Sequence, residues 1–141
     1  MNTNLKPLQI ILQEKNIKPT FVRLKILSYL ESNRTHPEAE KIFKAIKKEI
    51  PTISLTTIYN TLDIFRLKGL VRPLFITGTE VRYDRDTSFH GHFFCEKCGR
   101  ISNLDFEYDG LKKESVDGNK ITEVHGYFKG VCKDCINNNI E

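Results

Sequence analysis

Apolar residues recur at helical spacing in four segments of the first half of the chain. These segments cover residues 4–16, 20–32, 37–50 and 54–69. Apolar side chains three or four positions apart share one face of an α-helix, so each segment predicts an amphipathic helix. Residues 70–84 have a different pattern, with two short β-rich runs around Thr77-Gly78-Thr79, and this pattern predicts a hairpin.

Local residue chemistry predicts where the helices begin and end. Thr20 and Ser54 are good N-cap residues, and Pro37 suits the first turn of the third helix. Pro51 closes that third helix, and Gly69 is a suitable residue just beyond the end of the fourth. Three helices followed by a hairpin predict a winged helix-turn-helix, with one additional helix in front of it.

The fourth helix has two contrasting faces. Its apolar positions are Leu55, Ile58, Leu62 and Phe65, and we expect them to face the core. Hydroxyl and amide groups dominate the opposite face, which is poor helix chemistry if that face meets only solvent. Such groups can contact base edges and phosphates in a major groove. The residues expected to contact DNA are Ser54, Thr56, Thr57, Tyr59, Asn60 and Arg66.

Charge divides the chain at the same place as the patterns. Residues 1–83 contain 14 Lys/Arg and 7 Asp/Glu, whereas residues 84–141 contain 8 and 11, within a net charge of +4. A basic first half is consistent with a nucleic-acid footprint, although many soluble domains carry a similar charge without binding DNA. We therefore expect a DNA-binding domain at 1–83 and a second domain at 84–141. In the first, Lys68, Arg72 and Arg82 would lie near the wing, within reach of DNA phosphates.

The sequence favours a cytoplasmic protein without a membrane segment. No apolar run approaches the roughly 20 residues that a membrane helix requires. The first 16 residues have charges on both sides of a short apolar run and no small-residue cleavage site, so we expect no signal peptide.

The four cysteines form two pairs with the spacing of a zinc site. They are Cys95 and Cys98, and Cys132 and Cys135. Two CxxC pairs fill the four positions of a tetrahedral metal, which leaves no open position and indicates a structural zinc ion. Disulfides are disfavoured in a cytoplasmic chain, and a redox CxxC pair would not explain two such pairs.

Histidine and aspartate side chains indicate a second metal site. His90 and His92 alternate along a β-like run and so point to one face, and Asp84 precedes them. This mixture of ligands suits Fe(II), Mn(II) or Zn(II). His36 lies far away in sequence, and an isolated histidine beside a proline ordinarily belongs to a helix cap.

The motifs together resemble the ferric uptake regulator (Fur) family of bacterial repressors. They are "HPEAEKIF", "TTIYNTL", "RYD…TSFHGH" and "CEKCG…CKDC", and the resemblance extends over nearly the whole chain. It implies an α+β protein: an N-terminal winged helix-turn-helix domain followed by a small α/β dimerisation domain with the four-cysteine zinc site. It also implies a homodimer that binds double-stranded operator DNA.

Within the family, the chain looks most similar to the peroxide-stress regulators (PerR-like branch). Iron-uptake members usually have glutamate where "RYD" supplies Asp84. The resemblance implies Fe(II) or Mn(II) as the regulatory metal, with His36 and His90 as the targets of iron-catalysed oxidation by peroxide. The fifth ligand is Asp105 if two residues are inserted after Cys98, and Asn103 otherwise. The regulatory ligands implied by this resemblance are His36, Asp84, His90, His92 and Asp105.

Three other functions compete with peroxide sensing. An iron- or zinc-uptake repressor would use the metal only as co-repressor. A zinc deaminase would require a His-x-Glu beside its cysteines, which "HGH" does not supply, so we expect no enzyme activity. A zinc-ribbon interaction module would not explain the polar face of the fourth helix or the wing.

Overall fold

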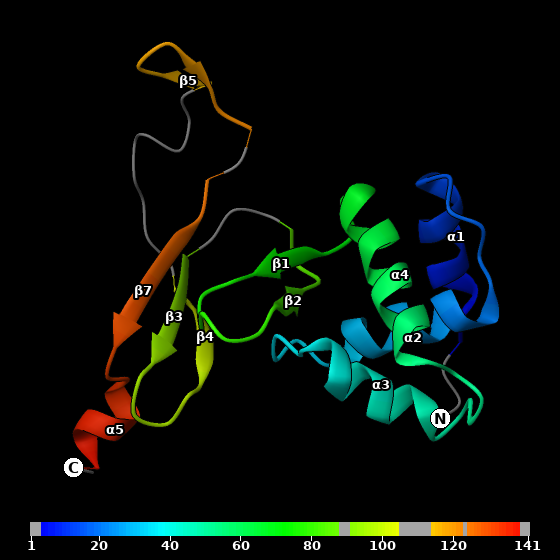
Figure 1. The fold of residues 1–141 in the computed structure, drawn as a ribbon, viewed down its shortest axis with the longest axis horizontal. Coiled ribbons are helices and arrows are strands. Elements are labelled where there is room, and N and C mark those ends of the chain that lie inside the picture. The colour runs from blue at the N-terminus through cyan, green and yellow to red at the C-terminus, as the bar shows by residue number, and fades with distance from the viewer. Residues whose placement is uncertain (1–3, 88–90, 105–113, 123, 139–141) are drawn as a thin grey trace. The chain divides into compact units, whose positions relative to one another are not determined.

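The computed structural model describes residues 4–87, 91–104, 114–122 and 124–138. The chain forms two compact units, Met1–Thr87 and Ser88–Glu141 (Figure 1). None of the helices in the described ranges has the length and apolar content that a membrane crossing requires.

Four helices build the first unit, one in each segment where the apolar pattern predicts a helix. Their apolar stripes meet in one core whose fully buried members include Leu12, Ile26, Ile42 and Phe65. The helices are α1 (Lys6–Glu14), α2 (Phe21–Ser32), α3 (Ala39–Lys47) and α4 (Leu55–Leu67).

Local caps set the ends of α2 and α4 as the sequence predicts. The Thr20 hydroxyl accepts from Arg23 N at 3.3 Å, and the Ser54 hydroxyl accepts from Thr57 N at 3.1 Å. Beyond α4, Gly69 has φ +76°, and Leu70 N donates to the carbonyl of Phe65 at 2.8 Å. This is the bonding of a Schellman motif, which satisfies carbonyls left over at the helix end.

The start of α3 differs from the prediction. The helix begins at Ala39 with Glu38 at its N-cap, so Pro37 lies outside the first turn. The Pro37 carbonyl accepts from Tyr83 N at 2.9 Å, and Glu38 forms an antiparallel bridge with Arg82. These pairings hold residues 37 and 38 in an extended conformation. The helix therefore begins at Ala39, two residues later than predicted, because of a long-range contact.

A β-hairpin completes the first unit as a winged helix-turn-helix. Strands β1 (Arg72–Leu74) and β2 (Arg82–Asp84) pair antiparallel, with Pro73 opposite Tyr83. The predicted turn, Thr77-Gly78-Thr79, lies in the connection, where Gly78 adopts φ +78°. Thus the hairpin forms a wing that follows α4 directly in the chain (Figure 1).

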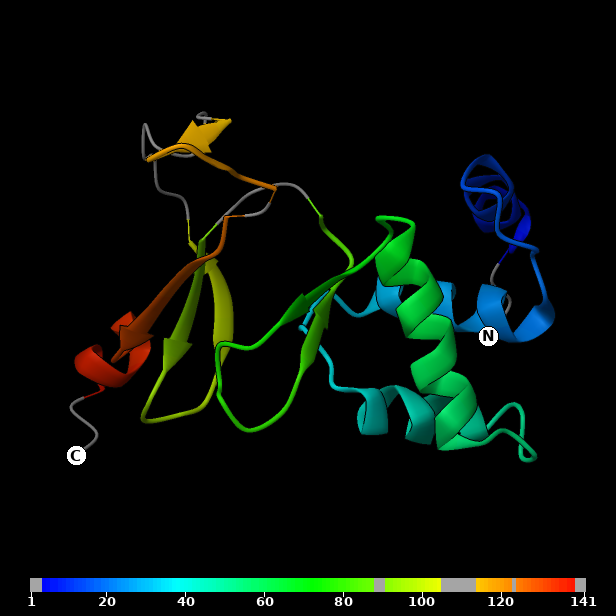
Figure 2. The same ribbon diagram turned by 45° about the horizontal axis from the view of Figure 1, so that its top comes forward.

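The second unit is a small sheet with a C-terminal helix. Its strands lie in the order β4-β3-β7, with β3 antiparallel to β4 and parallel to β7 (Figure 2). A separate hairpin, β5–β6, lies between β4 and β7 in the chain. The elements are β3 (Gly91–Cys95), β4 (Ile101–Leu104), β5 (Ser115–Val116), β6 (Asn119–Lys120), β7 (Gly126–Gly130) and α5 (Lys133–Asn137).

Candidate metal centres and nucleic-acid interface

The second unit brings all four cysteines together. Cys95 ends β3, Cys98 lies in the turn toward β4, Cys132 is the N-cap of α5, and Cys135 lies within α5. The four Sγ atoms lie within 4.8 Å of one another. Cys95 Sγ is 3.8 Å from Cys135 Sγ, and Cys98 Sγ is 3.9 Å from Cys132 Sγ.

These sulfur distances fit one tetrahedral zinc ion. Zn–S bonds of about 2.3 Å place neighbouring thiolates of a tetrahedron about 3.8 Å apart. A disulfide would require sulfurs at about 2.05 Å, and all four cysteines are free. The cluster is therefore suited to a structural zinc site with four protein ligands and no open position.

Backbone amides prepare Cys95 to be a thiolate. Cys98 N and Cys132 N donate to Cys95 Sγ at 3.4 and 3.3 Å, and these bonds lower the pKa of Cys95 to about 6. The hydrogen bond with Cys132 and burial raise the pKa of Cys135 to about 12. The lowered pKa of Cys95 favours the thiolate form that zinc binds, whereas the raised pKa of Cys135 means that zinc has to displace a proton there.

The turn between the first two cysteines is closed by its own backbone. Gly99 has φ +77°, a conformation in which a residue with an L side chain would be strained. Its N donates to the Cys95 carbonyl at 2.8 Å. Arg100 then places its guanidinium 3.8 Å from Cys132 Sγ and 2.7 Å from Asp134. The arginine thereby neutralises part of the charge that the thiolates collect.

A histidine and a carboxylate lie close together inside the first unit. His36 Nε2 is 3.4 Å from Asp84 Oδ2, and both residues are only 4% exposed. Asp84 ends β2, and its Oδ1 accepts from Asp86 N at 3.0 Å. The structure therefore joins two of the predicted regulatory ligands that are far apart in sequence.

The other predicted regulatory ligands belong to the second unit. His92 lies on β3, where it is buried, pairs in register with Asn103 of β4, and meets the Tyr127 ring edge-on at 6.5 Å. His90 and Asp105 lie outside the described residues. Their assignment as ligands stays a prediction.

The polar face of α4 is open to a ligand. The exposed side chains include Thr56, Tyr59, Asn60 and Arg66, whereas Thr57 is half-buried. Arg66 Nη2 pairs with Asp63 Oδ1 at 2.8 Å, so this cation is partly neutralised within the helix.

The apolar face of α4 mostly follows the prediction. It buries Ile58, Leu62 and Phe65, but Leu55 is only half-buried. Thr61 is also buried, a position that the sequence pattern left unassigned.

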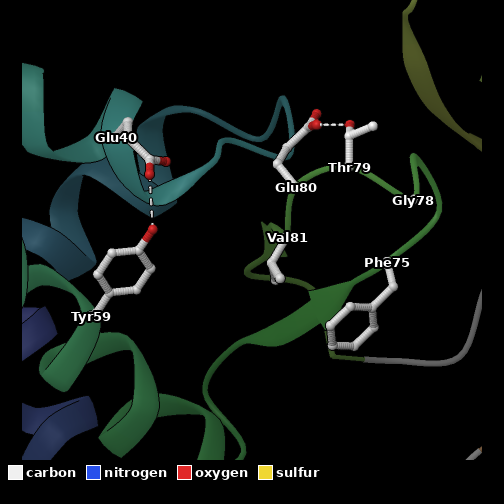
Figure 3. Close-up of a pocket in the computed structure, with 7 residues that line it drawn as sticks. All are labelled: Glu40, Tyr59, Phe75, Gly78, Thr79, Glu80 and Val81. Atoms are coloured by element: carbon white, nitrogen blue, oxygen red, sulfur yellow. Dashed lines mark hydrogen bonds between the residues drawn. The ribbon is translucent and has the colours of Figure 1, made fainter.

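Tyr59 makes a contact that the sequence did not reveal. Its hydroxyl donates to Glu40 Oε1 of α3 at 2.9 Å, and this bond raises the pKa of Tyr59 (Figure 3). Both side chains line a pocket between the helices and the wing turn, together with Phe75 and Glu80. No local signal marks Glu40 as a partner, because an acid in a first helical turn is ordinary helix chemistry.

Known proteins match this chain over most of its length. The model of the ferric uptake regulator family matches residues 14–128. A peroxide operon regulator from Bacillus subtilis is 38% identical over 129 residues, covering 88% of each chain. A peroxide-responsive repressor PerR from Staphylococcus aureus is 36% identical, covering 88% of this chain and 86% of its own. The crystal structure of a peroxide stress regulator from Campylobacter jejuni is 29% identical, with TM-score 0.65 over 93% of this chain and 96% of its own.

Proposed function

The chain belongs to the ferric uptake regulator family, and we propose that it is a metal-dependent transcriptional repressor that senses hydrogen peroxide. The observation that carries the proposal is the buried His36–Asp84 pair, with Nε2 and Oδ2 3.4 Å apart. Nitrogen and oxygen ligands of this type suit Fe(II) and Mn(II) and are chemically distinct from the four thiolates. Two relatives that are more than one-third identical bear peroxide-related names.

The two metals have different tasks in this proposal. Zinc on the four cysteines holds the second unit together and takes no part in sensing, because all four positions are filled. Fe(II) or Mn(II) is the regulatory metal. Its proposed ligands are His36, Asp84, His90, His92 and Asp105, with Asn103 as the alternative to Asp105.

The proposed regulatory ligands come from both units. A metal held by all of them would restrict how the units are placed relative to each other, and so favour one DNA-binding form of a homodimer. In that form the exposed polar face of α4 would enter the major groove of operator DNA in the cytoplasm. The residues proposed to contact DNA are Ser54, Thr56, Thr57, Tyr59, Asn60 and Arg66.

Peroxide sensing would follow from oxidation of the ligands themselves. Fe(II) held by these ligands would supply the redox chemistry that activates hydrogen peroxide beside the imidazoles. The ring of His36 or His90 would gain one oxygen from the peroxide, and the other oxygen would leave as water. The oxidised ring would bind metal weakly, and repression would end. Mn(II) would use the same ligands with little of this redox chemistry, which makes it the natural control.

Peptide mass spectrometry tests the proposal directly. Zinc-loaded protein with Fe(II) is treated with mild peroxide, and a Mn(II)-loaded sample is treated in parallel. We expect one added oxygen on the peptides that contain His36 or His90, with iron only. The exposed His125, which lies outside the proposed ligand set, serves as an internal control and should stay unmodified.

Other outcomes separate the alternatives. If all histidines stay unmodified while DNA binding still requires metal, the peroxide step is wrong and the chain is a metal-uptake repressor. If DNA binding is independent of added Fe(II) or Mn(II), the regulatory metal itself is wrong.

A further inference from the structure

Arg82 connects the wing to the loop that carries His36. Its Nη1 donates to the His36 carbonyl at 3.2 Å, although the two residues are 46 positions apart. Its Nε donates to Glu80 Oε1 at 2.9 Å, in the turn of the wing. One guanidinium is thus held at both ends, by a carboxylate and by a main-chain oxygen.

The loop that receives this contact has an unusual backbone. His36 adopts φ +58°, the left-handed region that residues other than glycine rarely occupy. The next residue, Pro37, accepts a hydrogen bond from Tyr83 N at 2.9 Å. The His36 loop is therefore attached to the edge of β2, the strand that also supplies Asp84. A strained conformation persists only where its surroundings over-determine it, and the Arg82 contact is part of those surroundings.

The chemistry of arginine suits this double contact. A guanidinium presents five N–H donors in a rigid planar fork, so it can hold Glu80 and the His36 carbonyl at the same time. The carboxylate orients the fork, and the side chains of Arg82 and Glu80 are only 27% and 28% exposed. The Glu80 backbone is fixed in turn, because its N donates to Thr77 Oγ1 at 3.3 Å and its carbonyl accepts from that hydroxyl at 3.1 Å.

We propose that Arg82 is a positioning residue for the regulatory metal: it fixes the His36 loop so that the imidazole faces Asp84, and Glu80 fixes Arg82. The inference rests on the proposed function, since it deepens the metal site described there. It is an alternative to the expectation that Arg82 serves the wing by contacting phosphate. Replacing a residue that supports a metal ligand from behind typically lowers metal affinity by about 10–100-fold.

The test measures Mn(II) affinity in the absence of DNA, by competition with a fluorescent chelator, on zinc-loaded protein. Arg82→Ala should weaken Mn(II) binding about tenfold, the lower end of the range for residues that support a ligand. Arg82→Lys should lie between wild type and Arg82→Ala, because one ammonium cannot hold both acceptors in the geometry of the fork. Zinc content and the melting temperature, measured on the same samples, should be unchanged.

Arg23→Ala is the matched control. Arg23 Nη1 also donates to a main-chain carbonyl, that of Lys18 at 3.0 Å, but in a different part of the same unit. Its substitution removes the same charge and the same kind of bond, and Mn(II) affinity should remain that of wild type.

The remaining outcomes are distinct. If Arg82→Ala binds Mn(II) like wild type but binds DNA weakly at saturating Mn(II), Arg82 is a phosphate contact and the positioning role is wrong. If Arg82→Ala fails to fold, Glu80→Gln and Arg82→Lys decide, and wild-type affinity in both overturns the proposal. If zinc-loaded wild-type protein binds no Mn(II), that result would instead contradict the proposed function.

Discussion

The two units are stabilised by different means. The first unit has a continuous apolar core contributed by all four of its helices, with side chains such as Ile58, Leu62 and Phe65 at most 1% exposed. In the second unit, the buried cluster within the described residues consists of Cys95, Cys132 and Cys135, with Phe93 packed against it. Cysteine side chains thus form the buried cluster of the second unit, whereas leucine and isoleucine dominate the core of the first.

This difference shows why the chain would use two metals. A unit as small as the second buries too little apolar surface for stability, and small domains commonly add a metal or a partner subunit. Binding energy at a structural zinc is then folding energy. The proposed regulatory metal would have no such task, since the apolar core holds the first unit and zinc would hold the second. Its ligands would then be able to exchange metal or be oxidised without loss of the fold.

The largest expected effect comes from removing a zinc ligand. Cys132→Ser should unfold the second unit, because structural zinc contributes about 10 kcal/mol or more in small zinc-dependent folds. Amide hydrogen exchange should show loss of protection in β3 and β7, with α4 still protected. Asp134→Asn, a neighbour that is not a ligand, is the control and should retain zinc. Protected β3 amides in zinc-free protein would contradict the contrast between the units.

A cavity in the apolar core should destabilise the first unit. Phe65→Ala removes a fully buried ring and should lower the free energy of unfolding by about 3–5 kcal/mol. Urea denaturation measures the loss, and zinc content should stay at wild type. Leu67→Ala is the control, because that side chain is 67% exposed and its substitution should cost less than about 0.5 kcal/mol. Zinc release by Phe65→Ala would show that the units do not fold separately.

Removing the cap of α4 should have a smaller effect. Ser54→Ala leaves Thr57 N without its side-chain acceptor and should lower the free energy of unfolding by about 1 kcal/mol. Ser54→Asp should restore the stability, because aspartate is also a strong N-cap. Equal losses for alanine and aspartate in urea denaturation would mean that the serine acts by another route.

The smallest expected effect concerns the ion pair beside the zinc cluster. Arg100 lowers the pKa of Asp134, so the pair adds stability above the ordinary pKa of an aspartate and loses it as the pH falls. Both side chains are more than half exposed, and solvent screens the pair. Asp134→Asn should therefore leave the melting temperature unchanged within error at neutral pH. A clear drop, or loss of zinc, would show that the pair helps to hold Cys132.

Local chemistry explains why part of the structure could be predicted. The caps at Thr20 and Ser54 and the glycine at 69 act on their own helix ends, so their effects are visible in a few consecutive residues. The helical stripes and the wing hairpin were likewise predictable, because side-chain periodicity reports which face is buried. Leu55 and Thr61 departed from the simple stripe, since burial depends on what packs nearby.

Metal chemistry shows the same division. The spacing within each CxxC pair lets its two thiolates bind the same metal ion, and four thiolates complete the tetrahedral coordination of zinc. Nothing in the local sequence places His36 beside Asp84. Their 3.4 Å separation arises because residues 37 and 38 pair with β2, and that pairing also moved the start of α3 from Pro37 to Ala39.

The sequence by itself therefore determined the helices, their caps, the wing and the zinc-binding cysteines, because each depends on residues a few positions apart. Only the tertiary structure decided the partners that come from distant segments. These are the His36–Asp84 pair, the Tyr59–Glu40 bond and the attachment of Arg82 to the His36 loop. The physical reason is that hydrogen bonds between distant residues depend on how the chain folds back on itself, which no short window of sequence records.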